Sequence, residues 1–288
     1  RCQLARRGRA SHMRFPSTLQ LPPSAQLAVA PLRPHVIERF DGERWSGLRD
    51  AVARQLHCAA DELGRLHELE AARGGPRTRK ARRRTTGSRC DDDALAELVA
   101  CYEAFICEVI APHVARHYHG PCESLAFQAM PALRVVTPGG AASGRRHRDA
   151  DYGHQPAQIN WWLPLAPAFG SNTLWLEEER HAPLEGDFGT AHRFHGHALH
   201  HYTKPNDTHA TRVSLDFRVV PGPLYNDDFP ASRAPATGRQ AFALGGYYSL
   251  CALDVATGAW RVERDEGASA LRGNAARRGG GGTRTKGP

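Results

Sequence analysis

The sequence has little that would place it in a membrane or among the common nucleotide-dependent and hydrolytic enzymes. Its longest near-continuous apolar stretch, Trp161 to Phe169, contains two prolines and is far shorter than the roughly 18 to 20 residues that cross a bilayer. It contains no P-loop, no dinucleotide-binding glycine fingerprint and no nucleophile elbow of the Ser-His-Asp hydrolases. No membrane partner is expected, and these enzyme classes have no support.

Paired cysteines are also missing. The seven cysteines include no CxxC pair, and their number is odd, which argues against a zinc site and against a disulfide framework. A reducing intracellular compartment is therefore the default. The Arg-rich, acid-free start of the chain also fits a transit peptide, so organelle targeting stays open and the location is not fixed.

Positive charge is present in excess but is unevenly distributed. The formal net charge is +8, and the excess lies in residues 1–37, 73–89 and 261–288, whereas the remainder of the chain has more acidic than basic residues. The basic loop 73–89 contains no aromatic residue and so offers no platform for base stacking. We expect solvated basic flanks and no specific nucleic-acid partner.

The chain divides into a leader, one folded domain and a tail. Prolines keep residues 1–36 out of regular structure, and the Gly-rich segment 261–288 cannot form a core. Residues 37–260 are expected to form a single domain with a helical preface at 43–117, whose two amphipathic helices, 43–71 and about 91–117, flank the basic loop 73–89. Short β-branched and aromatic runs follow, at 125–130, 132–137, 157–163, 173–177, 197–203 and 211–219. This order predicts a mainly β fold with flanking helices, an antiparallel barrel or jelly roll, with an extension to 260.

Two short patterns carry the chemical signal. His147 and Asp149 form a His-x-Asp triplet, and His201 is followed after ten residues by Arg212-x-Ser214. Each pattern alone is weak, but both in this order are expected in only a few per cent of random chains of this composition. Two imidazoles and one carboxylate on one face of an octahedral iron(II) leave three positions open for oxygen chemistry.

Strand 211–219 has two chemically different faces. Val213 and its alternate neighbours point one way, while Arg212, Ser214, Asp216 and Arg218 point the other. A strand whose polar face is exposed to solvent would explain this alternation. If the polar face instead lines a barrel, a buried Arg212 needs an anionic partner, and its guanidinium with the Ser214 hydroxyl matches a carboxylate. Arg218 is expected nearer the barrel end, away from that carboxylate.

Three segments, 147–154, 158–178 and 201–222, resemble the iron(II)/2-oxoglutarate-dependent dioxygenases, and within them the streptomycin-biosynthesis-type branch of the phytanoyl-CoA dioxygenase-like superfamily. The likeness spans about Met130 to Gly222, and FALGGYY at 242–248 extends it. It implies a double-stranded β-helix core (cupin-like jelly roll, about 123–222), with Fe(2+) as cofactor and 2-oxoglutarate and O2 as cosubstrates. By position it makes His147, Asp149 and His201 metal ligands and makes Arg212 with Ser214 the 2-oxoglutarate clamp.

Other candidates are weaker. Asn160 lies between apolar residues, so its buried amide needs partners that a bound cofactor could supply. Tyr152, His154 and Trp175 are candidate substrate contacts. His200 adjoins His201 and is the alternative ligand if the register is shifted by one residue, although in a strand it points to the opposite face.

The sequence thus predicts an oxygenase that hydroxylates a small-molecule substrate and releases succinate and CO2. The presence of Asp149 disfavours halogenation, because the related halogenases have a small residue there. Two alternatives stay open: a cupin-type metal enzyme without 2-oxoglutarate, and a non-catalytic β-sandwich that binds a polyanion through loop 73–89. The substrate and the oligomeric state are not determined by the sequence.

Overall fold

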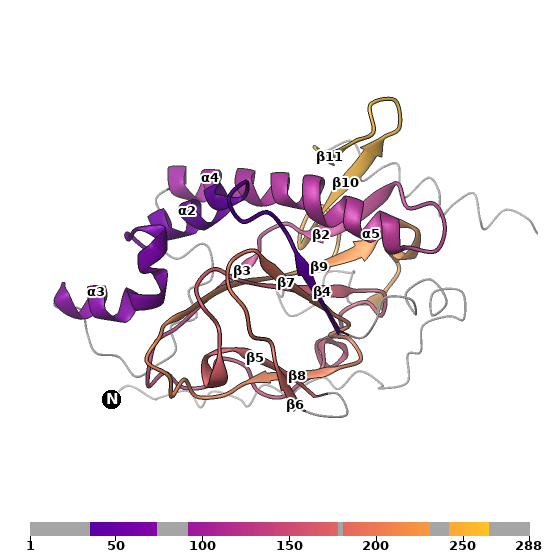
Figure 1. The fold of residues 1–288 in the computed structure, drawn as a ribbon. Helices are drawn as coiled ribbons and strands as arrows, with labels where there is room; N and C mark the ends of the chain where they lie inside the picture. Colours follow the sequence, from indigo (N-terminus) through magenta and orange to yellow (C-terminus); the bar gives the residue numbers. More distant parts are fainter. Residues whose placement is uncertain (1–34, 74–91, 178–180, 231–241, 265–288) are drawn as a thin grey trace, which may run out of the picture.

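The computed structural model describes residues 35–73, 92–177, 181–230 and 242–264, and it arranges them in three layers. Helices cover one face of a large antiparallel sheet, and a small sheet faces its other side, as Figure 1 shows. The basic loop 73–89, except for Arg73, lies outside the described residues, as do the segments before 35 and after 264. No helix in the described part is long and apolar enough to span a membrane.

The large sheet has eight strands, and every pairing in it is antiparallel. Its order is β1-β7-β4-β9-β2-β10-β11, with β3 paired to β9 beside β2. The bounds are β1 His35–Arg39, β2 Ser124–Gln128, β3 Ala132–Val136, β4 Ile159–Pro164, β7 Thr190–Phe194, β9 Arg212–Pro221, β10 Tyr248–Asp254 and β11 Ala259–Glu263. The small sheet has the order β6-β5-β8, formed by β5 Leu174–Glu177, β6 His181–Pro183 and β8 His200–Thr203. Two opposed antiparallel sheets confirm the predicted mainly β, jelly-roll fold.

The helical layer is more broken than the sequence predicted. Residues 43–71 form α2 (Ser46–Gln55), the 3-10 helix η1 (Ala60–Arg65) and α3 (Leu66–Ala72). The interruption follows α2 at His57, a non-glycine residue with a φ of +56°. The second predicted helix comprises α4 (Asp92–Phe105), a π-helical turn η2 (Ile106–Ile110) and α5 (Ala111–His117).

Alternation along β9 divides the interior into two environments. Val213, Leu215, Phe217 and Val219 belong to the main core with apolar side chains of α2 and α4. A second, smaller core lies between the sheets, where Trp162 and Phe194 of the large sheet meet Leu176 of the small one. The polar face of β9 therefore points into the space between the sheets, and the half-exposed alternative for this strand is wrong.

Candidate metal and cosubstrate site

The three predicted metal ligands lie close together in the structure: His147, Asp149 and His201. His201 reaches this cluster from a position 52 residues after Asp149 in the sequence. The main chains of His147 and His201 form an isolated bridge, with reciprocal N–H···O bonds of 3.1 and 2.9 Å. Asp149 opens the short 3-10 helix η3 (Asp149–Tyr152), which ends at Gly153 with a φ of +83°. A residue with a Cβ is strained at this φ, so glycine allows the chain to turn directly behind the carboxylate.

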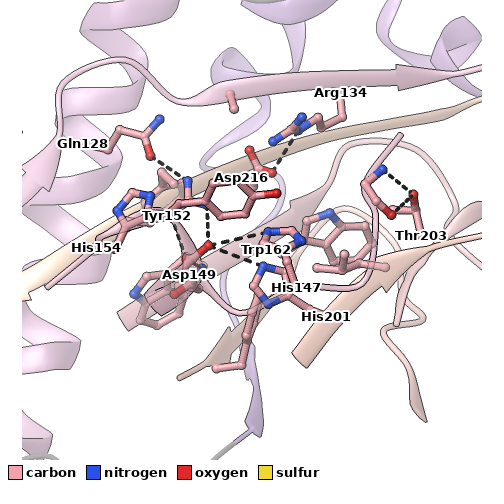
Figure 2. A pocket seen from close by; sticks show the side chains of 18 of the residues that line it. Gln128, Arg134, His147, Asp149, Tyr152, His154, Trp162, His201, Thr203 and Asp216 are labelled. Atoms are coloured by element: carbon pink, nitrogen blue, oxygen red, sulfur yellow. Dashed lines mark hydrogen bonds and ion pairs between the residues drawn. The ribbon is translucent and has the colours of Figure 1, made fainter. Parts of the chain in front are cut away.

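The geometry of the three side chains suits a metal ion. One ligand atom from each lies within 4.8 Å of the others, and the Nε2 atoms of His147 and His201 are 3.8 and 3.6 Å from Asp149 Oδ1 (Figure 2). The Nδ1 atoms contact the carbonyl oxygens of Arg145 at 2.6 Å and Leu199 at 3.1 Å. Because Nδ1 donates to these carbonyls, each neutral ring presents the Nε2 lone pair to the centre of the cluster.

Asp149 is held in place through its other oxygen. Its Oδ2 accepts hydrogen bonds from Asn160 Nδ2 at 2.6 Å, Gln158 Nε2 at 2.7 Å and Arg218 Nε at 2.9 Å. Burial alone would raise the pKa of Asp149, but the Arg218 guanidinium together with His154 and His201 more than offsets burial, and that pKa lies well below its usual value. The carboxylate is therefore ionised and fixed, with Oδ1 turned toward the histidines.

Asn160 is placed against a metal-ligand candidate. Besides bonding Asp149, its Oδ1 accepts the Gly196 N–H at 3.2 Å, and a Cβ on Gly196 would lie 2.6 Å from the Asn160 amide. Only glycine lets the chain approach the amide this closely. The structure therefore gives Asn160 the geometry of a positioning residue for Asp149, and its predicted contact with the cofactor stays a prediction.

Sequence reasoning missed the groups behind Asp149. Arg218, expected near the barrel end, instead forms a two-point ion pair with Asp149, with Nη2 to Oδ1 at 3.1 Å. Tyr247 Oη lies 3.2 Å from Arg218 Nη1 and donates to Gln128 Oε1 at 2.7 Å, while Tyr248 Oη donates to Gln158 Oε1 at 3.1 Å. The GGYY part of the 242–248 motif was the available signal for the two tyrosines.

Arg212 and Ser214 lie buried on the same face of β9. Arg212 Nη2 donates to Ser143 Oγ at 2.9 Å, but its Nε and the Ser214 hydroxyl have no hydrogen-bond partner among the described residues. Burial, with the nearby charge of Arg134, lowers the pKa of Arg212 to about 10. A buried cation with unused donors is suited to binding an anion.

A single cavity of about 530 Å³ contains these groups. Its lining includes the three metal-ligand candidates together with Arg212, Asn160, Tyr152 and His154. Tyr152 is 48% exposed and meets the His147 ring edge-on. His154 stacks on Phe242 with ring centroids 4.0 Å apart, and burial lowers its pKa to about 3.

Two sequence candidates lie apart from the cluster. Trp175 is not among the residues that line this cavity; its ring instead faces the Lys204 ammonium, with Nζ 3.2 Å from the ring centroid. His200 Nδ1 lies 3.8 Å from Glu177, and His200 does not belong to the three-residue cluster. The structure thus brings His201 to the metal-ligand candidates and leaves its neighbour outside.

Comparison with known proteins gives one curated relative with clear sequence similarity. No family model matches the chain. The streptomycin biosynthesis protein StrG of Streptomyces griseus is 37% identical over 126 residues, which cover 44% of this chain and 60% of StrG. The chain thus matches less than two thirds of the length of this relative. The match agrees with the predicted streptomycin-biosynthesis-type branch.

Solved structures with a similar arrangement include non-haem oxygenases. ThoJ, a non-heme monooxygenase in its apo form, aligns with a TM-score of 0.46 and 16% identity over 88% of this chain and 95% of ThoJ. EctD from S. alaskensis, solved with 2-oxoglutarate and 5-hydroxyectoine, aligns with a TM-score of 0.45 and 13% identity over 81% of this chain and 84% of EctD. At such scores a shared active site does not follow from the alignment.

Proposed function

We propose that this protein, a relative of the iron(II)/2-oxoglutarate-dependent dioxygenases of streptomycin-biosynthesis type, is an oxygenase that uses O2 to hydroxylate a small molecule. His147, Asp149 and His201 would hold the iron(II). Arg212 and Ser214 would bind 2-oxoglutarate. One observation supports this proposal most strongly. A single cavity contains both the cluster of three candidate metal ligands and a buried arginine, Arg212, that has no acidic ion-pair partner among the described residues.

The donor set fits the metal. Two neutral imidazole nitrogens and one carboxylate oxygen form the facial ligand set of non-haem iron(II) oxygenases, which keeps positions open. When bound, the iron would supply oxygen activation, and 2-oxoglutarate would supply two electrons as it is converted to succinate and CO2. Asp149 provides a ligand that a halide-accepting site lacks, so hydroxylation is the expected outcome.

The protein's own residues supply orientation and charge. Gln158, Asn160 and Arg218 fix the carboxylate, so that little reorganisation is needed when a metal binds. Arg212 neutralises an anion away from water, since its side chain is buried. Trp162 and Phe194 form an apolar wall of the cavity that limits access of water.

The buried Arg212, which has no acidic ion-pair partner among the described residues, also favours this function over a cupin-type enzyme without 2-oxoglutarate, because such an enzyme needs no such cation. The polyanion-binding alternative depends on loop 73–89, nearly all of which lies outside the described residues. No contact in the described part of the chain supports that alternative.

Release of succinate tests the proposal without knowledge of the substrate. Protein supplied with Fe(II), 2-oxoglutarate and O2 should form succinate slowly even without substrate, with one CO2 for each succinate. At a low concentration of 2-oxoglutarate, Asp149→Ala and Arg212→Ala should both abolish succinate formation. At a high concentration of 2-oxoglutarate, only Arg212→Ala should regain it. Wild-type protein that binds iron but never consumes 2-oxoglutarate would favour the cupin-type alternative.

A further inference from the structure

The charged side chains of the cavity are not balanced. Its lining includes the arginines Arg134, Arg145, Arg212 and Arg218 but only the acids Asp149 and Asp216. Arg218 is paired with Asp149 at 2.9 Å, and Arg134 with Asp216 at 3.0 Å. Two arginines, Arg212 and Arg145, therefore have no acidic partner among the residues that the structure describes.

The cofactors of the proposed function do not remove this excess. A divalent metal ion and the doubly negative 2-oxoglutarate cancel in net charge. Arg212 is assigned to 2-oxoglutarate, and Arg145 is then left as the unassigned cation of the cavity. An unopposed positive charge beside a partly enclosed site attracts anions.

Arg145 also lies close to the candidate metal centre. Its carbonyl oxygen accepts the Nδ1–H of His147 at 2.6 Å, so its backbone is tied to a metal-ligand candidate. Arg145 is exposed to solvent and is one of the residues that line the cavity. Arg145 thus combines an exposed position with a place beside the candidate metal centre.

Neighbouring arginines show that the lack of a partner is particular to Arg145. Arg146 forms an ion pair with Glu177, and Arg148 Nη2 lies 3.3 Å from Asp151. Neither Arg146 nor Arg148 is among the residues lining the cavity. Three arginines surround His147 in sequence, and the one that lines the cavity is the one without an acid.

We propose that Arg145 binds an anionic group of the substrate, and that the substrate is therefore a small molecule carrying a phosphate monoester or a carboxylate. This inference rests on the proposed function, because a cosubstrate at Arg212 is what leaves Arg145 as the remaining cation. Arg145 is thus a specificity-determining residue. A guanidinium offers two parallel N–H donors to either oxyanion.

Three sugars of similar size test whether the cavity prefers an anionic ligand. Glucose 6-phosphate, glucose and glucosamine have similar size and are anionic, neutral and cationic. Their affinities are measured by calorimetry under anaerobic conditions on protein loaded with Fe(II) and saturating 2-oxoglutarate. Wild-type protein should bind glucose 6-phosphate roughly 5- to 30-fold more tightly than glucose, and glucosamine most weakly.

Variants assign that preference to one residue. Arg145→Gln should reduce the preference for glucose 6-phosphate to less than about twofold, and Arg145→Glu should reverse it in favour of glucosamine. Arg146→Gln is the matched control and should keep the wild-type preference. Equal binding of the three sugars by the wild type, or an unchanged preference in Arg145→Gln, would overturn the inference. Glucuronate, which has a carboxylate at the carbon where glucose 6-phosphate has its phosphate ester, distinguishes a carboxylate preference from a phosphate preference when the two affinities are compared.

Failure of the proposed function has a different signature. In that case wild-type protein loaded with Fe(II) would show no heat of binding when 2-oxoglutarate is added, before any sugar is titrated. The sugar titrations still report on Arg145, because the comparison of Arg145→Gln with wild type does not depend on the cosubstrate. The three variants change exposed residues, Arg145 and Arg146, and circular dichroism should confirm that they fold.

Discussion

At the scale of single residues, the site depends on one oxygen atom. Asp149 Oδ2 accepts three hydrogen bonds, which leaves Oδ1 to face the two histidines. Side chains that orient a metal ligand typically contribute 10- to 100-fold to metal affinity, whereas loss of the ligand itself costs more. Ligands and orienting residues can therefore be separated by the size of the effect.

His201→Ala and His200→Ala test the assignment of the third ligand. His201 is buried in the cluster, whereas His200 lies beside Glu177 outside it. We expect His201→Ala to weaken Co(II) or Fe(II) binding by more than about 100-fold and His200→Ala by less than about threefold, as measured by anaerobic calorimetry. The reverse order would place the ligand one residue earlier.

Asn160→Ala tests whether the amide positions Asp149 or binds the cosubstrate. Its loss should weaken metal binding by about 10- to 100-fold. Gly196→Ala should have a similar effect, because its Cβ would displace the same amide. If Asn160→Ala leaves metal affinity unchanged and lowers only 2-oxoglutarate affinity, the amide contacts the cosubstrate instead.

At the scale of elements, the strand β10 and the turn before it connect the C-terminal hairpin to the site. Tyr248 is the first residue of β10, which pairs with β2, and Tyr247 lies in the turn directly before it. Their hydroxyls contact Arg218, Gln128 and Gln158. The hairpin of β10 and β11 therefore supports the side chains that hold Asp149, although it lies more than 90 residues later in the sequence.

Tyr247→Phe and Tyr102→Phe form a matched pair around Gln128. Tyr247 contacts the Gln128 side chain from the cavity, and Tyr102 of α4 donates to the Gln128 carbonyl at 2.8 Å from the helical layer. Tyr247→Phe should weaken metal binding by up to about tenfold, which corresponds to one neutral hydrogen bond. Tyr102→Phe should lower the free energy of unfolding by about 1–3 kcal/mol and leave metal affinity unchanged. Equal effects of both variants on metal affinity would contradict this division.

Elements with a regular pattern were predictable from the sequence, and others were not. The alternation in β9 predicted its two faces, and the predicted strands over 125–130, 132–137, 157–163, 173–177, 197–203 and 211–219 overlap β2, β3, β4, β5, β8 and β9. Strands β1, β6, β7, β10 and β11 were missed. The sequence of β7, TAHRF, shows the reason. Tertiary contacts bury His192 and Arg193 in this strand, and a short polar sequence does not predict that burial.

The residues of the candidate site also divide into those that the sequence predicted and those that it did not. The ligand candidates follow from spacing, because His-x-Asp and His-x10-Arg are local patterns. The partner of Asp149 could not be found this way, since the position of Arg218 relative to Asp149 depends on how β9 passes η3. Periodicity gave the correct face of β9 for Arg218 but not its depth in the barrel.

At the scale of the whole molecule, buried neutral histidines make stability depend on pH. Burial lowers the pKa of His154 to about 3 and of His197 to about 4, and it also lowers the pKa of His195. In the unfolded chain these groups have a pKa near 6.5 and bind protons first as the pH falls. The unfolded state is thus stabilised by acid, and the native stability, complete above about pH 6.5, is lost as the pH falls toward 4.

Thermal unfolding of metal-free protein between pH 7 and pH 4 measures this effect. The Tm should fall steadily across that interval. His154→Gln should reduce the slope more than His200→Gln does, because the pKa of His200 is also lowered by burial but its side chain is partly exposed. A Tm that does not vary between pH 7 and pH 4 would show that these histidines are not held neutral by the fold.

The most direct test of the central claim is an anaerobic titration of the Fe(II)-loaded protein with 2-oxoglutarate, followed by the visible metal-to-ligand charge-transfer band. The band should appear only when both are present and should be absent in Asp149→Ala. In Arg212→Ala the iron should still bind, but the titration midpoint should shift by roughly 30-fold to several thousand-fold, because a buried charge-assisted pair is lost; Arg212→Lys should recover part of the shift. An unchanged midpoint in Arg212→Ala, or no band in iron-loaded wild-type protein, would contradict the account.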